Sequence, residues 1–546
     1  MSKFFHFAIA ALLLLSTPVH AQPVFDDAGA AAIKKTIDDS LSSLSALRQS
    51  SGEGMKYGDI TVTPKDGFYE MRIPDIRIQT VTGAIAEVGT IVSNVIPDAN
   101  GDYKLTAALP QSMRIVEADG TSKIELKIGS QRFSGVWRPS LEQLIKGDLA
   151  YGDLQVNIAG EKPVTIRISA MESVVDMKEN GDQTWSGPRT FVLRGITLDD
   201  GAEKKASLSI DSMSGNTHYD KINLAIAKKM KDQMRALLSK PEGDIAREDI
   251  EQALAAYKSE GGFLPDGMRM DFELKGLKVD VMPVAREAQD AATLKRKRLN
   301  LARFAVNSAA TGLLSEKNGA STLGLSLEGL DVPDAPEELA GMIPSNASLD
   351  LRLKNLPMKD ITSMVGSLFN KALDSSMALD NADTAAIAAA EEDMKSQIAL
   401  AMLALPQQLS DAGTALDITN TFMQAADLTT TLDGKFTASP TSPLVAEGSM
   451  TLGFNGIDEL IAKLRLLGET GNAKANAYAQ GLILLQLSGQ QQQAVNNKSL
   501  RTYKLELTPE GKALMNGADL SSFISGFTGK AQDPSPAPAP APTPTP

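Results

Sequence analysis

Few residues of this chain are of the types that carry out acid–base or metal chemistry. The sequence has no cysteine and three histidines, of which only His218 lies beyond residue 21. One histidine without cysteine does not supply a zinc, iron or copper site of the His/Cys kind. No G-x-S-x-G elbow is present and no Gly-Lys pair is followed by Ser or Thr, so serine-triad and phosphate-loop chemistry have no motif here. His218 stands among Asn216, Thr217 and Asp220, and we expect it in a solvated turn.

Acidic side chains are numerous, and one group has the spacing of a calcium loop. Asp98, Asn100 and Asp102 occupy alternate positions, but the loop glycine is missing and Leu109 stands where a bidentate Glu is needed. We interpret this segment as a hairpin turn. A glycosidase needs two convergent carboxylates, and among 67 acidic residues no pair is singled out by the sequence. We predict no enzyme, no metal and no cofactor, with a hydrolase as the residual alternative.

The elements that would position any site are strands with a phase change. FELKGLKV, which starts at Phe272, alternates apolar and polar residues and resumes one step out of phase after Gly276. Five further segments do the same, and the residues at their breaks are Asp75, Gly195, Gly329, Asn355 and Gly456. Strand side chains alternate with period two, so we predict one extra residue at each break, a β-bulge that tolerates positive φ and curves the sheet. The alternative is that each strand ends at its break.

Turn signals and helical stripes indicate the fold class. Residues 22–220 are predicted to be β-rich, with a helical start at about 27–50, because Asn-Gly and Asp-Gly turns separate alternating runs. Residues 221–530 add amphipathic helices. They are expected at 224–240, 247–258, 359–375, 383–405 (with Pro406 as the stop) and twice between 457 and 487. We predict an α+β protein with a large, curved, bulged antiparallel β-sheet or sheets, and amphipathic helices packed on one face in the second half.

The two ends and the charge predict where the protein resides. Lys3, the apolar run 7–15 and small residues before Gln22 have the form of a secretory signal over residues 1–21. The run is far shorter than the ~20 residues that span a bilayer, so we predict a periplasmic or secreted chain, from a Gram-negative cell, with no transmembrane segment after cleavage. Residues 531–546 alternate proline with small residues, which is typical of a disordered tail. The net charge of −13 argues against a nucleic-acid partner.

A curved sheet has a concave face, and we predict that this face and its covering helices form a trough that holds a lipid or another amphiphile. The residues predicted to line it are Leu193, Leu274, Leu327, Leu353, Met230 and Met234. Basic charge beside an apolar stripe can also contact an anionic membrane surface. The residues predicted to do so are Lys228, Lys229, Lys231 and Arg235. The alternatives are a helix that docks on the sheet with solvated lysines, and helices that fill the trough completely.

The signal segment, the strands of the FELKGLKV type, the helices between them and the late stretch YKLELTPEGKALMNGADL together resemble uncharacterised proteobacterial secreted or periplasmic families of unknown function. In texture they are distantly similar to the AsmA-like envelope proteins, from which we expect this chain to differ in having no N-terminal anchor. The resemblance implies a periplasmic, β-rich envelope protein in contact with lipid. The competing prediction is a secreted scaffold or interaction protein with a fully packed core and envelope proteins as its partners.

Overall fold

The computed structural model describes residues 25–49, 53–160, 163–200, 206–238, 240, 265–282, 296–314, 318–378, 384–440, 442, 445–495 and 498–520. The predicted signal over 1–21, the predicted helix at 247–258 and the predicted tail at 531–546 lie outside these residues.

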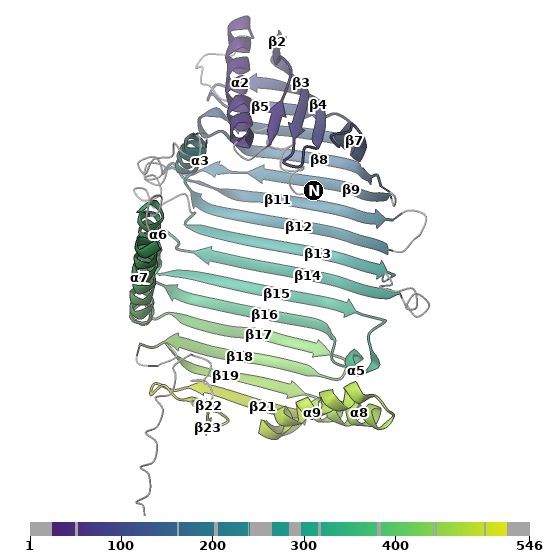
Figure 1. Cartoon of the computed structure of the whole chain (residues 1–546), viewed down its shortest axis with the longest axis vertical. Coiled ribbons are helices and arrows are strands. Elements are labelled where there is room, and N and C mark those ends of the chain that lie inside the picture. The colour runs from purple at the N-terminus through teal and green to yellow at the C-terminus, as the bar shows by residue number, and fades with distance from the viewer. Residues whose placement is uncertain are drawn as a thin grey trace, which may run out of the picture.

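The described residues form one 23-stranded antiparallel sheet, in which most strands pair with their neighbours along the chain (Figure 1). The strands of its first half are β1 (Gly54–Lys56), β2 (Thr61–Lys65), β3 (Phe68–Gln79), β4 (Ile85–Pro97), β5 (Tyr103–Ala108), β6 (Ser112–Val116), β7 (Ser122–Arg138), β8 (Gln143–Ile158), β9 (Val164–Asp176), β10 (Lys178–Glu179), β11 (Trp185–Asp199) and β12 (Ala206–Ile222). Those of its second half are β13 (Gly267–Val281), β14 (Lys297–Thr311), β15 (Gly319–Asp331), β16 (Pro344–Leu356), β17 (Ala415–Ala425), β18 (Thr429–Ala438), β19 (Ala446–Asn455), β20 (Gln490–Val495), β21 (Lys498–Leu507), β22 (Ala513–Met515) and β23 (Ala518–Asp519). The predicted antiparallel sheet with several helices is confirmed.

Most helices lie at the ends and along one side of this sheet, and the short α5 lies at the other side (Figure 1). They are α2 (Asp27–Gln49), the 3-10 turn η1 (Pro139–Leu141), α3 (Leu224–Leu238), α5 (Glu337–Ala340), α6 (Met358–Ala378), α7 (Thr384–Asp411), α8 (Ile457–Glu469) and α9 (Ala473–Ser488). In Figure 1, α2 stands at the N-terminal end, α8 and α9 at the opposite end, and α3, α6 and α7 beside the left-hand ends of the strands. The predicted stop at Pro406 is wrong, because α7 continues to Asp411 although proline removes one backbone hydrogen bond.

Three of the six predicted phase changes fall in one row that crosses the sheet. Gly195, Gly276 and Gly329 have φ values of 61°, 66° and 64°, as expected for a break that needs a left-handed residue. The predicted extra residue is wrong at all three, because the strands run through each glycine and the pairing keeps the same register on both sides. Each glycine instead faces a residue of the next strand that also leaves the alternation. We call this line of residues the crease row: Gly129, Asp153, Ser169, Gly195, Asp211, Gly276, Ala302 and Gly329.

Two other breaks are bulges and one is an element boundary. The register of β3 against β4 shifts by one residue next to Asp75, and that of β16 against β15 shifts next to Asn355. Both residues have left-handed backbones, with φ of 51° and 55°, so the predicted bulges are confirmed there. At Gly456 the alternative holds, because β19 ends at Asn455 and α8 begins at Ile457.

The fully buried core lies at the N-terminal end of the sheet. Asp26 caps α2 by accepting a hydrogen bond from the Gly29 N–H at 2.8 Å. The helix then buries a stripe spaced three and four residues apart against β1–β3, and its members are Ala30, Ile33, Ile37 and Leu41. The same cluster continues through β3–β9 to Met171. From β11 to β19 the described strands contribute few fully buried side chains.

An ion pair holds this end of the sheet together. Asp98 Oδ1 accepts hydrogen bonds from the Asn100 and Asp102 N–H groups, so the calcium-like segment is the hairpin turn that its spacing permitted. The Asp102 carboxylate is buried and receives the Arg138 guanidinium through two bonds of 2.8 and 2.9 Å. Arg138 also donates to Glu179, and the two carboxylates raise its pKa. The pair therefore ties the turn before β5 to the end of β7 and to β10.

Valine at Gly276 or Gly329 should lower the free energy of unfolding by ~1–3 kcal/mol. A Cβ at Gly276 would lie 2.8 Å from the Asp211 Cβ, and one at Gly329 would lie 2.7 Å from the Ala302 Cβ, in addition to the left-handed strain. Denaturant unfolding measures the loss. Gly160→Val is the matched control, since Gly160 has open space around it and an ordinary backbone. Equal stability of all three variants and the wild type would contradict the role of the crease row.

Candidate functional site

One face of the sheet presents apolar side chains in continuous cross-strand rows. Directly opposed residues of antiparallel strands point to the same side, so the pairing assigns every strand residue to a face. One row runs through Met171, Leu193, Met213, Leu274, Phe304, Leu327, Ala347 and Met423. The next row runs through Phe191, Gly215, Phe272, Val306, Leu325 and Leu349. We call the face that carries these rows, between β9 and β18, the apolar face.

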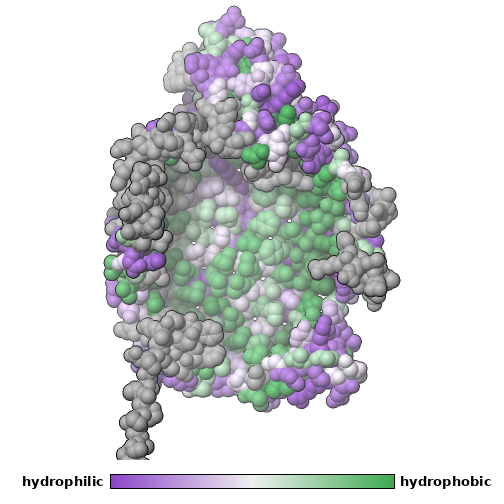
Figure 2. Space-filling view, in the orientation of Figure 1, coloured by the Kyte–Doolittle hydropathy of each residue, from purple (hydrophilic) through white to green (hydrophobic). Residues whose placement is uncertain are grey.

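The apolar face continues across the crease row. Ile128, Leu154 and Ile168 lie beyond the crease, and Met171 and Leu193 lie before it, yet all five belong to one hydrophobic cluster. The phase change in each strand therefore keeps apolar residues on one side along its whole length. Figure 2 shows the result as a recessed, largely hydrophobic field between the helical side of the molecule and its other edge.

Large side chains of this face are open to solvent in the described part of the structure. Phe191 is 39% exposed, Met270 46% and Leu323 37%, although each lies in the middle of the sheet. The Phe191 ring lies against Gly215 of the next strand, where a Cβ would come within 2.2 Å of it. Between β11 and β17, no described helix supplies a buried cluster over this face.

The opposite face carries many charged side chains, and several of them form ion pairs. Arg303 bonds to Glu273 at 2.6 Å and to Glu328 at 2.5 Å, and Arg194 bonds to Glu172 at 2.6 Å. The Lys275 ammonium and the Arg303 guanidinium lower the pKa of Glu273. The two faces of the same strands therefore differ in chemistry, and we call this one the charged face.

Both ends of the apolar face are closed by packed elements. At the N-terminal end Tyr151, paired with Met171, is 6% exposed within the α2 cluster. At the other end α8 and α9 form a second cluster that includes Phe454 of β19. The Tyr503 ring meets Phe454 edge-on at 5.5 Å, and its hydroxyl donates to the Leu485 carbonyl of α9. These two packed clusters therefore bound the open part of the apolar face at the two ends of the sheet.

The structure brings together most of the predicted lining residues. Leu193, Leu274 and Leu327 lie in one row of the apolar face, and Leu353 lies on the same face, opposite Ser321 and Leu416. Met230 lies half-buried on α3, a helix that does not belong to these rows. The Met234 side chain is outside the described residues. Whether any of these residues line a ligand stays a prediction.

The apolar face also contains residues that the prediction missed. Four large examples are Phe191, Met213, Phe272 and Phe304. The alternation in each strand gave a signal for them, since they stand two positions from a leucine already chosen or occupy the matching place in the next strand.

The predicted membrane-contact residues of α3 are partly engaged by the protein itself. Lys228 bonds to Glu142 at 3.2 Å and to Asp232 at 2.5 Å, and Lys231 bonds to Glu142 at 3.0 Å. Lys229 is exposed, and the Arg235 side chain lies outside the described residues. Leu224 at the start of α3 is buried in a cluster with Trp185. This helix is therefore docked at its first turn, and its contact with an anionic surface stays a prediction.

His218 lies within β12, so the predicted turn is wrong. It is exposed on the charged face and pairs with Pro188 and Arg269. Asn216, Thr217 and Asp220 favour turns when considered alone, but here the pairing of β12 with β11 and β13 determines the local structure. Among the described residues no group of three His, Cys, Asp or Glu side chains is placed to hold a metal ion.

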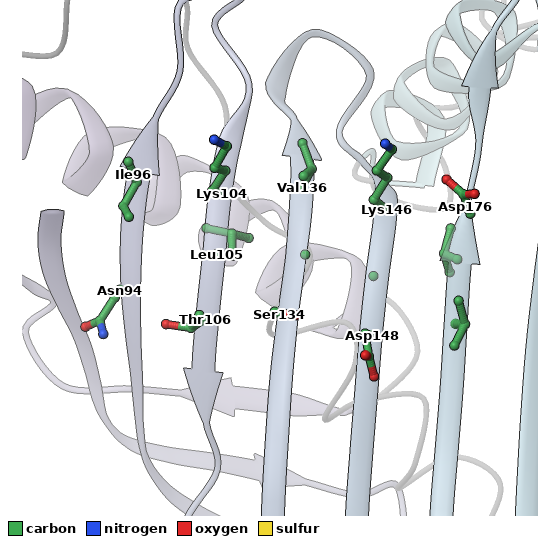
Figure 3. A pocket seen from close by; sticks show the side chains of 14 residues that line it. Asn94, Ile96, Lys104, Leu105, Thr106, Ser134, Val136, Lys146, Asp148 and Asp176 are labelled. Atoms are coloured by element: carbon green, nitrogen blue, oxygen red, sulfur yellow. The ribbon is translucent and has the colours of Figure 1, made fainter. Parts of the chain in front are cut away.

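A shallow pocket lies on the charged face near the N-terminal end (Figure 3). Its volume is about 510 Å³, and Lys104, Val136 and Lys146 come from consecutive strands across it. Ile96 and Val174 add apolar surface, at 39% and 42% exposure. The pocket is wide and open, and its side chains do not converge on a common point in Figure 3. We therefore give the apolar face precedence as the candidate site.

Comparisons with family models, with curated proteins and with solved structures found no match for this chain. In the described part of the chain, no helix combines the length and apolar character needed to cross a bilayer.

Stability should fall at alkaline pH because of Tyr151. Burial raises its pKa to about 12, while an unfolded tyrosine titrates near 10. The folded state therefore holds the proton more tightly, and the stabilisation is complete below pH ~10 and is lost as the pH rises towards ~12, by about 2–3 kcal/mol. Tyr151→Phe should remove this loss in denaturant unfolding over that range. Tyr478→Phe, at an exposed tyrosine, is the control. Parallel pH profiles for the wild type and Tyr151→Phe would refute the assignment.

Proposed function

We propose that this chain is a non-enzymatic periplasmic protein of the cell envelope that binds a lipid or another amphiphile along its apolar face. The observation that carries the proposal is a face that spans many strands and whose described residues form no ion pairs, opposite a face rich in them. A solvent-exposed apolar surface of this extent usually marks a binding surface. The apolar sheet face is proposed to curve into a trough, for which its recessed appearance in Figure 2 is the support.

The dimensions of the apolar face suit extended hydrocarbon chains. Eight strand-to-strand steps separate β9 from β18, and with about 4.8 Å per step the face is roughly 40 Å long. One leaflet of a bilayer core is about 15 Å thick. The face is therefore long enough for more than one acyl chain placed end to end, or for one long amphiphile.

The rest of the proposal rests on sequence. The predicted signal over residues 1–21 supports export to the periplasm, and the resemblance to secreted proteobacterial families and, distantly, to AsmA-like proteins supports a place in the envelope. The scarcity of histidine and the lack of cysteine support a protein without catalytic activity.

Glutamate at Phe191 should weaken binding of an apolar dye such as N-phenylnaphthylamine by roughly tenfold or more, because a carboxylate would have to lose water against hydrocarbon. The matched control is Phe422→Glu, since Phe422 has the same 39% exposure but lies on the charged face, opposite Ser348. Dye fluorescence titration measures both variants. Native mass spectrometry of wild type purified without detergent should also show bound lipid. Loss of dye binding by equal factors in both variants, or a wild type without lipid and without dye affinity, would sink the proposal.

A scaffold that binds envelope proteins is the second candidate, and α7 favours it. Ile398, Leu400 and Leu403 of this helix are 45%, 57% and 75% exposed, and they point in different directions around the helix because they are two and three residues apart. A group of exposed apolar side chains on one helix can mark a surface that a partner covers. Under this reading, Leu403→Glu should abolish capture of a partner protein while leaving dye binding unchanged.

A further inference from the structure

Arg189 is a charged residue on the apolar face. It pairs with Val175 and Thr217 and stands in the row that continues through Met270, Ser308 and Leu323. Its guanidinium lies 5.6 Å from the centre of the Tyr219 ring and donates one hydrogen bond, to Gln143 Oε1 at 3.0 Å. The Arg189 Nε is buried and has no hydrogen-bond partner in the described residues.

This state differs from that of neighbouring arginines. Arg138 is held by Asp102 and Glu179, and Arg194 by Glu172. Within the described residues Arg189 has no ion pair with a carboxylate. A guanidinium that is partly withdrawn from water without a counter-charge is costly, and it is the side chain best suited to bind a carboxylate or phosphate through two parallel bonds.

The acidic residue beside the acceptor of this hydrogen bond is already engaged. Glu142 precedes Gln143 and is shared by Lys228 and Lys231 of α3, and Lys228 also pairs with Asp232. Glu142 is therefore occupied by the α3 lysines. The adjacent rows are apolar from Phe191 to Leu349.

We infer that Arg189 binds the oxyanion head of an amphiphile, a carboxylate or a phosphate, whose hydrocarbon chain lies along the apolar rows towards β18. This rests on the proposed function and adds the class and direction of the ligand. The Arg189 guanidinium faces the head group, the Tyr219 ring and the Thr217 hydroxyl flank it, and the leucine and phenylalanine rows contact the chain.

Competition against the bound apolar dye separates head group from chain. At mildly alkaline pH, laurate should displace the dye from wild type at a concentration roughly tenfold lower than dodecanol, which has the same chain without charge. Arg189→Gln should lose this preference and still bind both, and Arg189→Lys should keep part of it. Arg303→Gln, which removes an ion-paired arginine of the charged face, should leave the preference unchanged.

The outcomes keep the two proposals apart. Equal displacement by laurate and dodecanol in wild type overturns the role of Arg189 and leaves the apolar face as a binder of uncharged chains. Failure of both competitors and of the dye overturns the proposed function itself. An additional arm uses inorganic phosphate: if it alone raises the melting temperature of wild type but not of Arg189→Gln, the site takes a free oxyanion, and the amphiphile assignment is wrong.

Discussion

The alignment of the phase changes in one row is the constraint on which the rest of the sheet depends. A strand whose apolar residues skip a step would turn half of its length to the wrong face if its neighbours did not skip with it. Here the skip occurs in the crease row of β7, β8, β9 and β11–β15 without a shift in register. Four of the eight residues of the row are glycines, and a Cβ at any of them would collide with the facing residue. One aligned row thus preserves a single apolar face.

Because the apolar face is open, the buried side chains that stabilise the fold are concentrated at the two ends of the sheet. The α2 cluster buries many large side chains completely, and the α8–α9 cluster closes the opposite end. Between them, the described strands are held by backbone pairing and by ion pairs on the charged face. Exposed ion pairs contribute little to folding. The middle of the sheet therefore depends on its backbone ladders and its ends, and it retains apolar surface that a ligand can cover.

The sequence was sufficient for the strand class and for the presence of most described helices, because their apolar periods are local. It also placed four leucines on one face, because period-two alternation assigns residues to sides without knowledge of the partner strand. It was not sufficient for register. Whether Gly276 marks an inserted residue or an in-register break depends on what Asp211 does in the neighbouring strand, and a single strand carries no such information. Arg189 was missed for a related reason: it becomes exceptional only when the pairing shows that its row is otherwise uncharged.

The edges of the sheet argue for a ligand on its face. At one end β3 is flanked by the short strands β1 and β2, and at the other the edge is divided between β20, of six residues, and β22 and β23, of three and two. Short edge strands discourage pairing with a further strand. Interaction by strand addition is therefore disfavoured at both ends, while the apolar face offers a surface without backbone donors or acceptors to satisfy. A hydrocarbon chain needs no such groups, whereas a protein segment laid across this face would have to satisfy its own, as a helix does.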